Sequence, residues 1–284
     1  MNALGVGGWE QANWVRARED AEARPSVGPE KNEVRTRTFE LGSVRCSEVI
    51  PLAQPVERTL IYLPGGGYTQ GSWASHGELA SRLAVKARAR LVMFHYRLAP
   101  EHPFPAALDD VLAAWKALLS DGTDPRSCIL CGDSAGGGLA VSSLLALRDR
   151  GLALPRASLL FSPWVDLSVS GASVVLNARL DWYPVDCLRA QAGCYLAGLD
   201  AEDVRVAPLR ADLRDLPPFF VQVGSAEILL DDSRRLAAAL VSAGVSVELD
   251  EWSGLIHGWQ FYPELLTEAR AAVERAAAFA VRST

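Results

Sequence analysis

The sequence predicts an α/β fold, with a mainly parallel sheet of eight strands and helices on both of its faces. Three observations support this prediction. Short apolar runs bounded by Gly, Pro or Asp recur along the chain, and helix-length segments separate them. This alternation is typical of βαβ units, in which each helix crosses back over the sheet. The chain has 284 residues, 49% of them hydrophobic, so a single domain can bury a sufficient core without disulfide or metal support.

The expected strands follow one another along the chain. Residues 34–41 and 44–49 surround Gly42 and Ser43, so they are expected to form an antiparallel hairpin at one edge of the sheet. Six further strands, each short and rich in apolar or β-branched residues, are expected at 60–63, 91–96, 128–131, 159–161, 219–223 and 245–249. Helices are expected at about 75–89, 105–120, 134–150, 231–243 and 263–281.

Two regions break the alternation of strands and helices. Residues 1–30 are polar, with Trp9 and Trp14 among them, and have room for one short amphipathic helix. Residues 165–205 separate two expected strands and are too long for an ordinary connection. We expect both regions to form a small helical cap over the sheet, within a single domain that spans residues 1–284.

Composition argues against several classes of function. The net charge of −6 and the pI of about 5.3 argue against binding of nucleic acid or of an anionic membrane, which needs a basic face. Since no run of 18 apolar residues occurs, no membrane span is expected, and residues 1–14 lack the pattern of a signal peptide. Together with five scattered cysteines that do not resemble a disulfide framework, these features predict a cytoplasmic protein.

Cys128 and Cys131 form a C-x-x-C pair, which invites a zinc or redox interpretation. No second pair in the sequence would complete a zinc site. The two cysteines flank Ile129 and Leu130 in an apolar run, so both thiols are expected in a buried strand. No metal and no organic cofactor is expected.

The segment Gly132-Asp133-Ser134-Ala135-Gly136 lies between an expected strand and an expected helix. The order strand, G-x-S-x-G, helix is the context of a nucleophile elbow. A serine on such a tight turn stands clear of the sheet, and small flanking residues let the strand and helix pass closely. The N-terminus of the helix adds partial positive charge near a developing oxyanion. Ser134 is therefore the candidate nucleophile, and an N-cap role is the alternative.

A second glycine-rich segment, Pro64 to Tyr68, follows the expected strand 60–63. Its three glycines expose backbone N–H groups without side chains in the way, so the loop can point donors at an oxyanion. In folds with a nucleophile elbow, such a loop shares this task with the N–H that follows the nucleophile, here that of Ala135. A flexible turn without a catalytic role is the alternative.

Together these segments resemble one family, the hormone-sensitive-lipase-like esterases (bacterial family IV) of the α/β-hydrolase fold-3 group. The matching segments occur in family order between about residues 40 and 282. They are Pro64 to Tyr68 with Gly71-Ser72, Tyr96 to Ala106, Gly132 to Gly137, Ser162 to Trp164 with Asp166, Leu216 to Pro218, Gly224 to Asp232, and His257-Gly258. The resemblance implies the α/β-hydrolase fold, carboxylesterase activity on short-chain acyl esters, and a helical cap made of the two regions named above.

One position departs from the family pattern. The loop normally reads His-Gly-Gly-Gly, and here Pro64 replaces the histidine, which in the family braces the loop. The resemblance implies that the oxyanion donors are the N–H groups of Gly66 and Gly67, with that of Ala135, so Pro64 removes none of them. Proline fixes its own φ and restricts Leu63, which supplies stiffness in place of the lost brace.

His257 is the candidate general base, because it is the last of four histidines and lies in a loop before the final helix. The order Ser, acid, His is that of the resembled fold. The acid is expected after strand 219–223, where Glu227, Asp231 and Asp232 follow. Glu227 stands just beyond the strand and aligns with the acidic position of the family, whereas the two aspartates open a helix. Glu227 is therefore the predicted acid, with Asp231 as the alternative.

The other conspicuous side chains receive structural or open interpretations. Asp133 is expected to hold the elbow by hydrogen bonds. Structural roles are expected for Arg97, Glu101 and Asp166, surface or packing positions for His76 and His102, and a hydrogen-bonded core position for His95. Five aromatic residues are candidates either for a substrate pocket or for the core: Tyr68, Trp73, Trp164, Trp182 and Tyr195.

The predicted function is that of a serine carboxylesterase that hydrolyses small short-chain esters through an acyl-enzyme. Two alternatives stand beside it. The same triad serves amidases, deacetylases and acyltransferases, and the sequence does not separate these from an esterase. A non-catalytic small-molecule receptor is the other alternative: Pro64 favours it, and the retention of Ser134 and His257 opposes it. The resemblance also suggests a homodimer.

Overall fold

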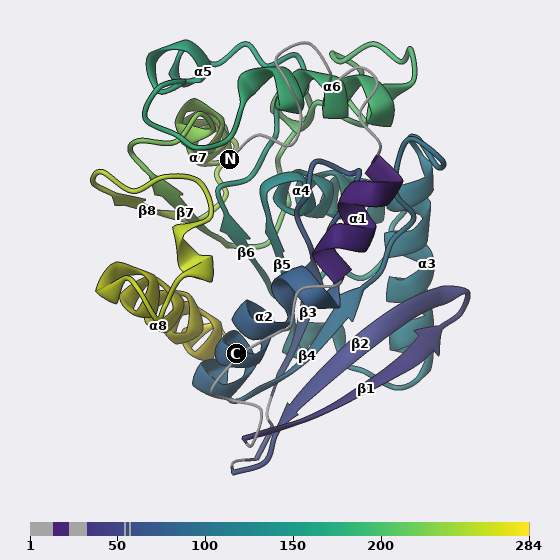
Figure 1. The fold of residues 1–284 in the computed structure, drawn as a ribbon. Helices are drawn as coiled ribbons and strands as arrows, with labels where there is room; N and C mark the ends of the chain where they lie inside the picture. The colour runs from purple at the N-terminus through teal and green to yellow at the C-terminus, as the bar shows by residue number, and fades with distance from the viewer. Residues whose placement is uncertain (1–13, 23–32, 54, 57, 284) are drawn as a thin grey trace.

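The computed structural model describes residues 14–22, 33–53, 55–56 and 58–283. Its centre is an eight-stranded sheet with the order β1-β2-β4-β3-β5-β6-β7-β8 (Figure 1). The strands are β1 (Val34–Leu41), β2 (Val44–Pro51), β3 (Arg58–Leu63), β4 (Ala89–Phe94), β5 (Cys128–Asp133), β6 (Ala157–Phe161), β7 (Phe219–Gly224) and β8 (Val247–Trp252). β2 pairs antiparallel with β1 and β4, and every other pair is parallel. The predicted fold class and edge hairpin are confirmed.

The helices connect these strands in the order that the sequence predicts. They are α1 (Trp14–Glu22), α2 (Trp73–Ala87), α3 (Ala106–Ser120), α4 (Ser134–Asp149), α5 (Ser173–Leu176), α6 (Val185–Leu196), α7 (Leu230–Ser242) and α8 (Thr267–Arg282). Short 3-10 turns lie at Pro125–Ser127, Pro208–Arg210 and Trp259–Phe261. The last of these turns follows the loop that carries His257, so it places that loop between β8 and α8.

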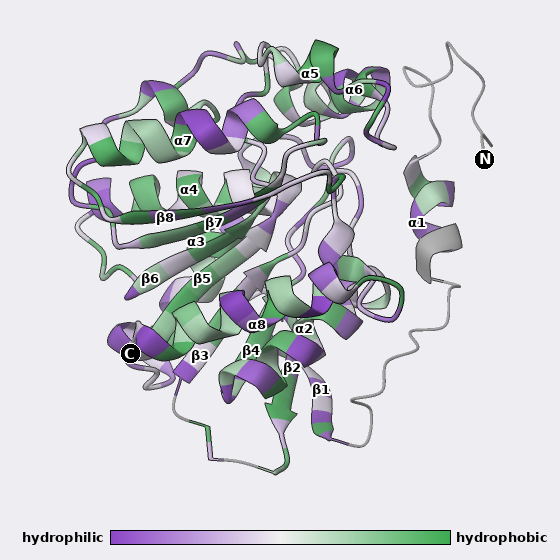
Figure 2. Cartoon of the chain, turned by 90° about the vertical axis from the view of Figure 1, so that its left-hand side faces the viewer, coloured by the Kyte–Doolittle hydropathy of each residue, from purple (hydrophilic) through white to green (hydrophobic). Residues whose placement is uncertain are grey.

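Two hydrophobic clusters lie on opposite faces of the sheet. On one face, Leu83 of α2 and Phe279 of α8 share a buried cluster with Tyr62 of β3. On the other face, residues of α3, α4 and α7 share a buried cluster with Ile61 and Leu63 of the same strand. Successive side chains of a strand point to opposite faces, so a strand covered on both sides is apolar throughout. The hydropathy colouring of Figure 2 shows the resulting apolar strands between the helices.

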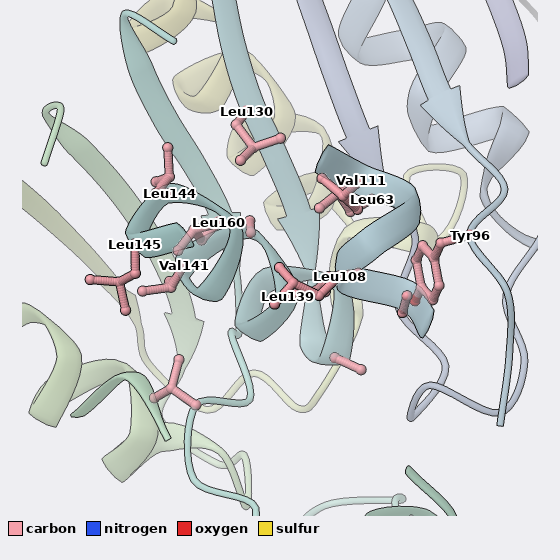
Figure 3. Packing of buried hydrophobic residues seen from close by; sticks show 14 of the residues in the cluster. Leu63, Tyr96, Leu108, Val111, Leu130, Leu139, Val141, Leu144, Leu145 and Leu160 are labelled. Atoms are coloured by element: carbon pink, nitrogen blue, oxygen red, sulfur yellow. The ribbon is translucent and has the colours of Figure 1, made fainter. Parts of the chain in front are cut away.

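Helix α4 is the central helix of the larger cluster. Its side chains Leu139, Val141 and Leu144 pack with Leu130 of β5 and Leu160 of β6 (Figure 3). All five residues are at most 2% exposed. Because this packing fixes α4 on β5 and β6, it also fixes the turn between β5 and α4, where the candidate nucleophile lies.

Several predicted boundaries are wrong by two to four residues; the strand expected at 91–96, for example, is β4, which spans Ala89–Phe94. Two of the differences have a clear local cause. The strand expected at 245–249 is β8, which begins at Val247, because the N–H of Val245 donates to the carbonyl of Leu240 and closes the end of α7. The helix expected from residue 263 is α8, which begins at Thr267. In the residues before it, the N–H groups of Leu265 and Leu266 donate to the carbonyl of Tyr262 and form a separate turn.

The region 165–205 carries α5 and α6, which lie together above the strands in Figure 1. Of residues 1–30, only α1 lies within the described residues, and it packs beside α2. Arg18 of α1 donates to the carbonyls of Thr69 and Ala99, at 2.6 and 2.7 Å, so α1 is tied to the glycine-rich loop. The remainder of the region 1–30 lies outside the described residues, and the division into one domain with a cap stays a prediction.

The C-x-x-C pair belongs to a buried strand, as the sequence predicts. Cys128 and Cys131 both lie in β5 and are 0% exposed, and all five cysteines of the chain are free thiols. Burial raises the pKa of Cys128 to about 12, so this thiol is a poor nucleophile. Within the described part of the chain, no helix is long and apolar enough to cross a membrane.

Truncating a valine in α4 tests the packing. Val141 is 0% exposed, and Val241 of α7 is 65% exposed. Val141→Ala removes buried methyl groups and leaves a cavity, so we expect it to lower the free energy of unfolding by about 2 kcal/mol. The matched control Val241→Ala is expected to change it by less than about 0.5 kcal/mol. Urea unfolding measures both, and equal losses would contradict the described packing.

Candidate active site

Ser134 occupies a strained turn between β5 and α4. Its φ of 50° is in the left-handed region, which costs energy for a residue with a side chain. Glycines on both sides make the turn sterically possible. A Cβ on Gly132 would lie 2.4 Å from the carbonyl oxygen of Gly136, and one on Gly136 would lie 2.0 Å from that of Leu63. The nucleophile elbow expected from G-x-S-x-G is therefore present.

His257 and Glu227 form a hydrogen-bonded couple beside the elbow. The Nδ1 atom of His257 lies 3.0 Å from Oε2 of Glu227, whose side chain is fully buried. The other carboxylate oxygen, Oε1, accepts hydrogen bonds from Ser162 Oγ at 2.8 Å and from Gly224 N–H at 2.6 Å. With Nδ1 committed to Glu227, the Nε2 atom is the ring nitrogen that remains for proton transfer.

Asp181, in the segment between α5 and α6, is hydrogen-bonded to the loop that carries His257. Its Oδ1 atom accepts the N–H of His257 at 3.2 Å, and its Oδ2 atom accepts the N–H of Ile228 at 2.9 Å. The indole N–H of Trp182 donates to the carbonyl of His257 at 2.7 Å. Residues 165–205, called the inserted region below, thus fix the backbone of the candidate base His257 and that of Ile228, the residue after Glu227.

The environment of His257 favours its protonated form. Burial disfavours the charged ring and lowers its pKa, but the hydrogen bond and negative charge of Glu227 outweigh this effect. The charges of Asp181 and Asp133 act in the same direction as Glu227, so the pKa of His257 lies above its ordinary value. This arrangement stabilises an imidazolium, the form that a general base takes after it accepts a proton.

The glycine-rich loop is packed so tightly that Gly66 and Gly67 have no room for side chains. Gly66 and Gly67 have φ values of 113° and 62°, and a Cβ on Gly66 would lie 2.5 Å from the carbonyl oxygen of Gln70. The hydroxyl of Tyr96 donates to the carbonyl of Pro64 at 2.5 Å. The tyrosine thus holds Pro64, the first residue of the loop, through a backbone atom. The N–H of Ala135 is among the first of α4, which have no acceptor inside their helix.

Asp133 links the loop to the elbow, as the sequence predicts. Its Oδ1 atom accepts the hydroxyl of Tyr62 at 2.8 Å and the N–H of Gly65 at 2.9 Å. The Nε2 atom of His76 lies 3.3 Å from the carboxylate. These partners explain why a buried carboxylate is tolerated at this position.

A cavity of about 340 Å³ opens at Ser134 and His257. Its wall includes Gly66 of the glycine loop and the aromatic side chain of Trp182. The remaining lining residues are Gln70, Ser75, His76, Asp133, Tyr183, Gly258, Phe261 and Tyr262. The candidate nucleophile, the candidate base and the glycine-rich loop therefore face one common space.

Of the five aromatic pocket candidates, Trp182 lines this cavity and the other four lie elsewhere. Tyr68 and Tyr195 are buried and stack on each other with ring centroids 3.7 Å apart, and Trp164 lies beside Tyr68. Trp73 begins α2 and packs against the cluster between α2 and α8. Tyr68, Trp164 and Tyr195 are therefore parts of the protein interior, and Trp73 is partly buried.

The remaining acidic candidates have other partners. Asp231 Oδ2 accepts the N–H of Ser173 at 2.8 Å. Asp232 is 2% exposed and accepts the N–H groups of Val165 and Asp166, both at 2.9 Å. Both aspartates lie in the first turn of α7, as expected, and their carboxylates anchor the inserted region. Neither has a described contact with His257.

The residues given structural roles have the expected kinds of contact. Arg97 pairs with Asp110, Glu101 with Arg18, and Asp166 with Arg235. His95 has the expected hydrogen bond, with Nε2 2.7 Å from Ser47 Oγ, but the expected core position is wrong: the residue is half-buried and lies just beyond the end of β4.

The sequence patterns do not predict several of the residues that line the cavity. His76, expected at the surface or in packing, is 6% exposed and lines the cavity beside Asp133. The one sequence signal for Tyr183 as a cavity residue is its position next to Trp182, a predicted pocket residue. Phe261 and Tyr262 carry no motif. In the described part of the chain, no group of three or more His, Cys, Asp or Glu side chains is placed to hold a metal ion.

Comparison with known proteins identifies the family. A family model for the alpha/beta hydrolase fold matches residues 60–261. An acetyl-hydrolase of Streptomyces hygroscopicus is 47% identical over 223 residues, covering 78% of this chain and 75% of that protein. An esterase of Acinetobacter venetianus is 34% identical over 254 residues, covering 89% of this chain and 84% of that protein. This chain therefore belongs to the α/β-hydrolase family.

Solved structures identify a group within this family that the chain clearly resembles. An esterase from the bacterial hormone-sensitive lipase family superposes with a TM-score of 0.88 at 33% identity, covering 99% of both chains. The esterase EstE5 gives a TM-score of 0.93 at 32% identity, covering 99% of this chain and 94% of that one. The resemblance to hormone-sensitive-lipase-like esterases is thus confirmed. The chain is a carboxylic ester hydrolase.

The pKa of His257 predicts the pH profile. The base must be neutral to accept a proton, and its pKa is raised. We therefore expect kcat/KM for an ester to fall with decreasing pH through a limb above 6.5, the ordinary value for histidine. Glu227→Gln removes the charge that raises this pKa, so the limb should move to lower pH while the plateau falls by about 10⁴-fold. A limb at an unchanged pH in Glu227→Gln would exclude Glu227 as the partner of the base.

Proposed function

We propose that this chain hydrolyses short-chain carboxylic esters through a Ser134–His257–Glu227 triad and an acyl-enzyme. The observation that carries the proposal is the cavity at which Ser134 of the elbow and the His257 ring meet, with Gly66 in its wall. The 3.0 Å contact between His257 and Glu227 supports the assignment of the third member.

The first half of the reaction forms the acyl-enzyme. The Oγ atom of Ser134 attacks the ester carbonyl carbon while Nε2 of His257 takes its proton. The carbonyl oxygen becomes negative and accepts hydrogen bonds from the N–H groups of Gly66, Gly67 and Ala135. When the tetrahedral intermediate collapses, the carbon–oxygen bond to the alcohol breaks, and His257 returns its proton to the leaving alkoxide.

The second half of the reaction releases the acid. A water molecule gives a proton to His257 and adds to the acyl carbon. The same N–H groups hold the second oxyanion. Collapse breaks the bond to Ser134 Oγ, which recovers its proton from His257. The carboxylate of Glu227 keeps Nδ1 protonated throughout, so that Nε2 is the proton acceptor in both halves.

The size and walls of the cavity support the proposed preference for short chains. Its volume of about 340 Å³ is at the small end of ligand pockets, which range from about 300 to 1,000 Å³. Trp182, Tyr183 and Phe261 provide rigid aromatic walls. The similar Streptomyces protein is named an acetyl-hydrolase, and EstE5 was soaked with p-nitrophenyl butyrate. Acetyl and butyryl esters are therefore the proposed substrate class.

Hydrolysis of p-nitrophenyl acetate, butyrate and octanoate tests this proposal. We expect kcat/KM to be highest for the two short esters and at least 10-fold lower for the octanoate, because the cavity has little room for the longer chain. Ser134→Ala should lower turnover of each ester by about 10⁶-fold. The matched anilides should react more slowly. Unchanged turnover in Ser134→Ala would refute the triad, and a preference for the octanoate or for the anilides would refute the substrate class.

A further inference from the structure

Gln191, a buried side chain of α6, reaches the glycine-rich loop from the inserted region. It is 0% exposed. Its Nε2 atom donates to Oγ1 of Thr69 at 3.1 Å and to the carbonyl of Gly66 at 3.4 Å. Its Oε1 atom accepts the hydroxyl of Tyr183 at 2.6 Å. A single amide therefore joins the loop to a wall of the catalytic cavity.

The contact with the loop is steric as well as polar. A Cβ on Gly67 would lie 2.0 Å from the Cδ atom of Gln191. The side chain of Gln191 thus lies directly against Gly67, and this residue must be glycine. The amide group therefore prevents the loop from moving towards α6.

The peptide geometry makes this contact relevant to the oxyanion. The carbonyl of Gly66 and the N–H of Gly67 belong to one planar peptide unit, in which they point in opposite directions. Gly66 O also accepts the N–H groups of Thr69 and Gln70, each at 3.1 Å. Donors that hold this carbonyl also hold the orientation of the Gly67 N–H. Gln191 is the donor among them that comes from a different element of the fold.

We infer that Gln191 is a positioning residue of ester hydrolysis, which keeps the Gly66–Gly67 peptide oriented towards the reacting carbonyl. The inference rests on the proposed function, since it assigns a role in that reaction. Gln191 touches the loop and does not line the cavity, so it acts on the transition state through the Gly67 N–H. Its loss should therefore lower kcat while KM stays nearly constant.

The test compares two buried glutamines. Gln191→Met keeps the length of the side chain and removes the hydrogen bonds. Gln222→Met is the matched control, because Gln222 is also 0% exposed and donates to Asp250 and to the carbonyl of Ala272, away from the cavity. Thr69→Val is a milder variant that removes the Oγ1 acceptor for Gln191 and, with it, the 3.3 Å hydrogen bond that the same hydroxyl donates to the carbonyl of Gly66. It keeps the test valid if Gln191→Met does not fold. For each variant, kcat and KM for p-nitrophenyl acetate, the inhibition constant of benzeneboronic acid and the melting temperature are measured.

We expect Gln191→Met to lower kcat by 10- to 100-fold with KM within about 2-fold, less than the 10²–10³-fold loss caused by removing a donor outright. Thr69→Val should lower kcat by about 3- to 10-fold. Benzeneboronic acid forms a tetrahedral adduct with the serine, so its inhibition constant should rise in parallel with the loss of kcat. Gln222→Met should keep kcat and the inhibition constant within about 2-fold of the wild type.

The inference is overturned if Gln191→Met and Thr69→Val keep the kcat of the control. It is also overturned if their only change is a lower melting temperature or a different KM. Such a result with an active wild type would leave the proposed function standing. Absence of turnover in the wild type would instead overturn the proposed function, and this inference with it.

Discussion

The buried carboxylate of Asp133 connects the two loops on which the proposed chemistry depends. It ends β5 one residue before Ser134, and it accepts the hydroxyl of Tyr62 and the N–H of Gly65. Burial acts to raise the pKa of Asp133, but the interaction with His76 and these hydrogen bonds outweigh it, so the pKa lies below its ordinary value. An ionised group with these partners cannot move without losing them. The glycine-rich loop therefore keeps a defined position relative to the nucleophile.

The inserted region and α1 further restrain the glycine-rich loop and the loop that carries His257. Asp181 holds the backbone of His257, Gln191 contacts Gly66 and Gly67, and Arg18 of α1 donates to the carbonyl of Thr69. Pro64, which replaces the family histidine, is held through its carbonyl by the hydroxyl of Tyr96. Since that contact uses a backbone atom, it is open to any residue at this position. The loop is thus braced from the sheet side and from the side of α6, without a histidine at its start.

The sheet, the helices and the close approach of the three candidate triad residues could be predicted because their sequence patterns are local. Ser134 stands in a motif between a strand and a helix, and Glu227 and His257 follow strands in a fixed order. His76 and Gln191 could not be predicted, because they reach the site from helices whose sequences show no sign of the partner. The aromatic candidates show the same limit: composition does not distinguish an aromatic side chain on a cavity from one inside the core.

The most direct test of Ser134 as the activated nucleophile is covalent labelling by a fluorophosphonate, followed by mass mapping of the modified peptide. Activated serines displace fluoride from such reagents, whereas ordinary serines do not. The described geometry predicts one adduct per chain, on the peptide that carries Ser134, with loss of ester hydrolysis in proportion to labelling. No adduct would contradict the account and favour a chain that binds small molecules without turning them over. An adduct on another residue with hydrolysis retained would contradict the assignment of Ser134 as the nucleophile.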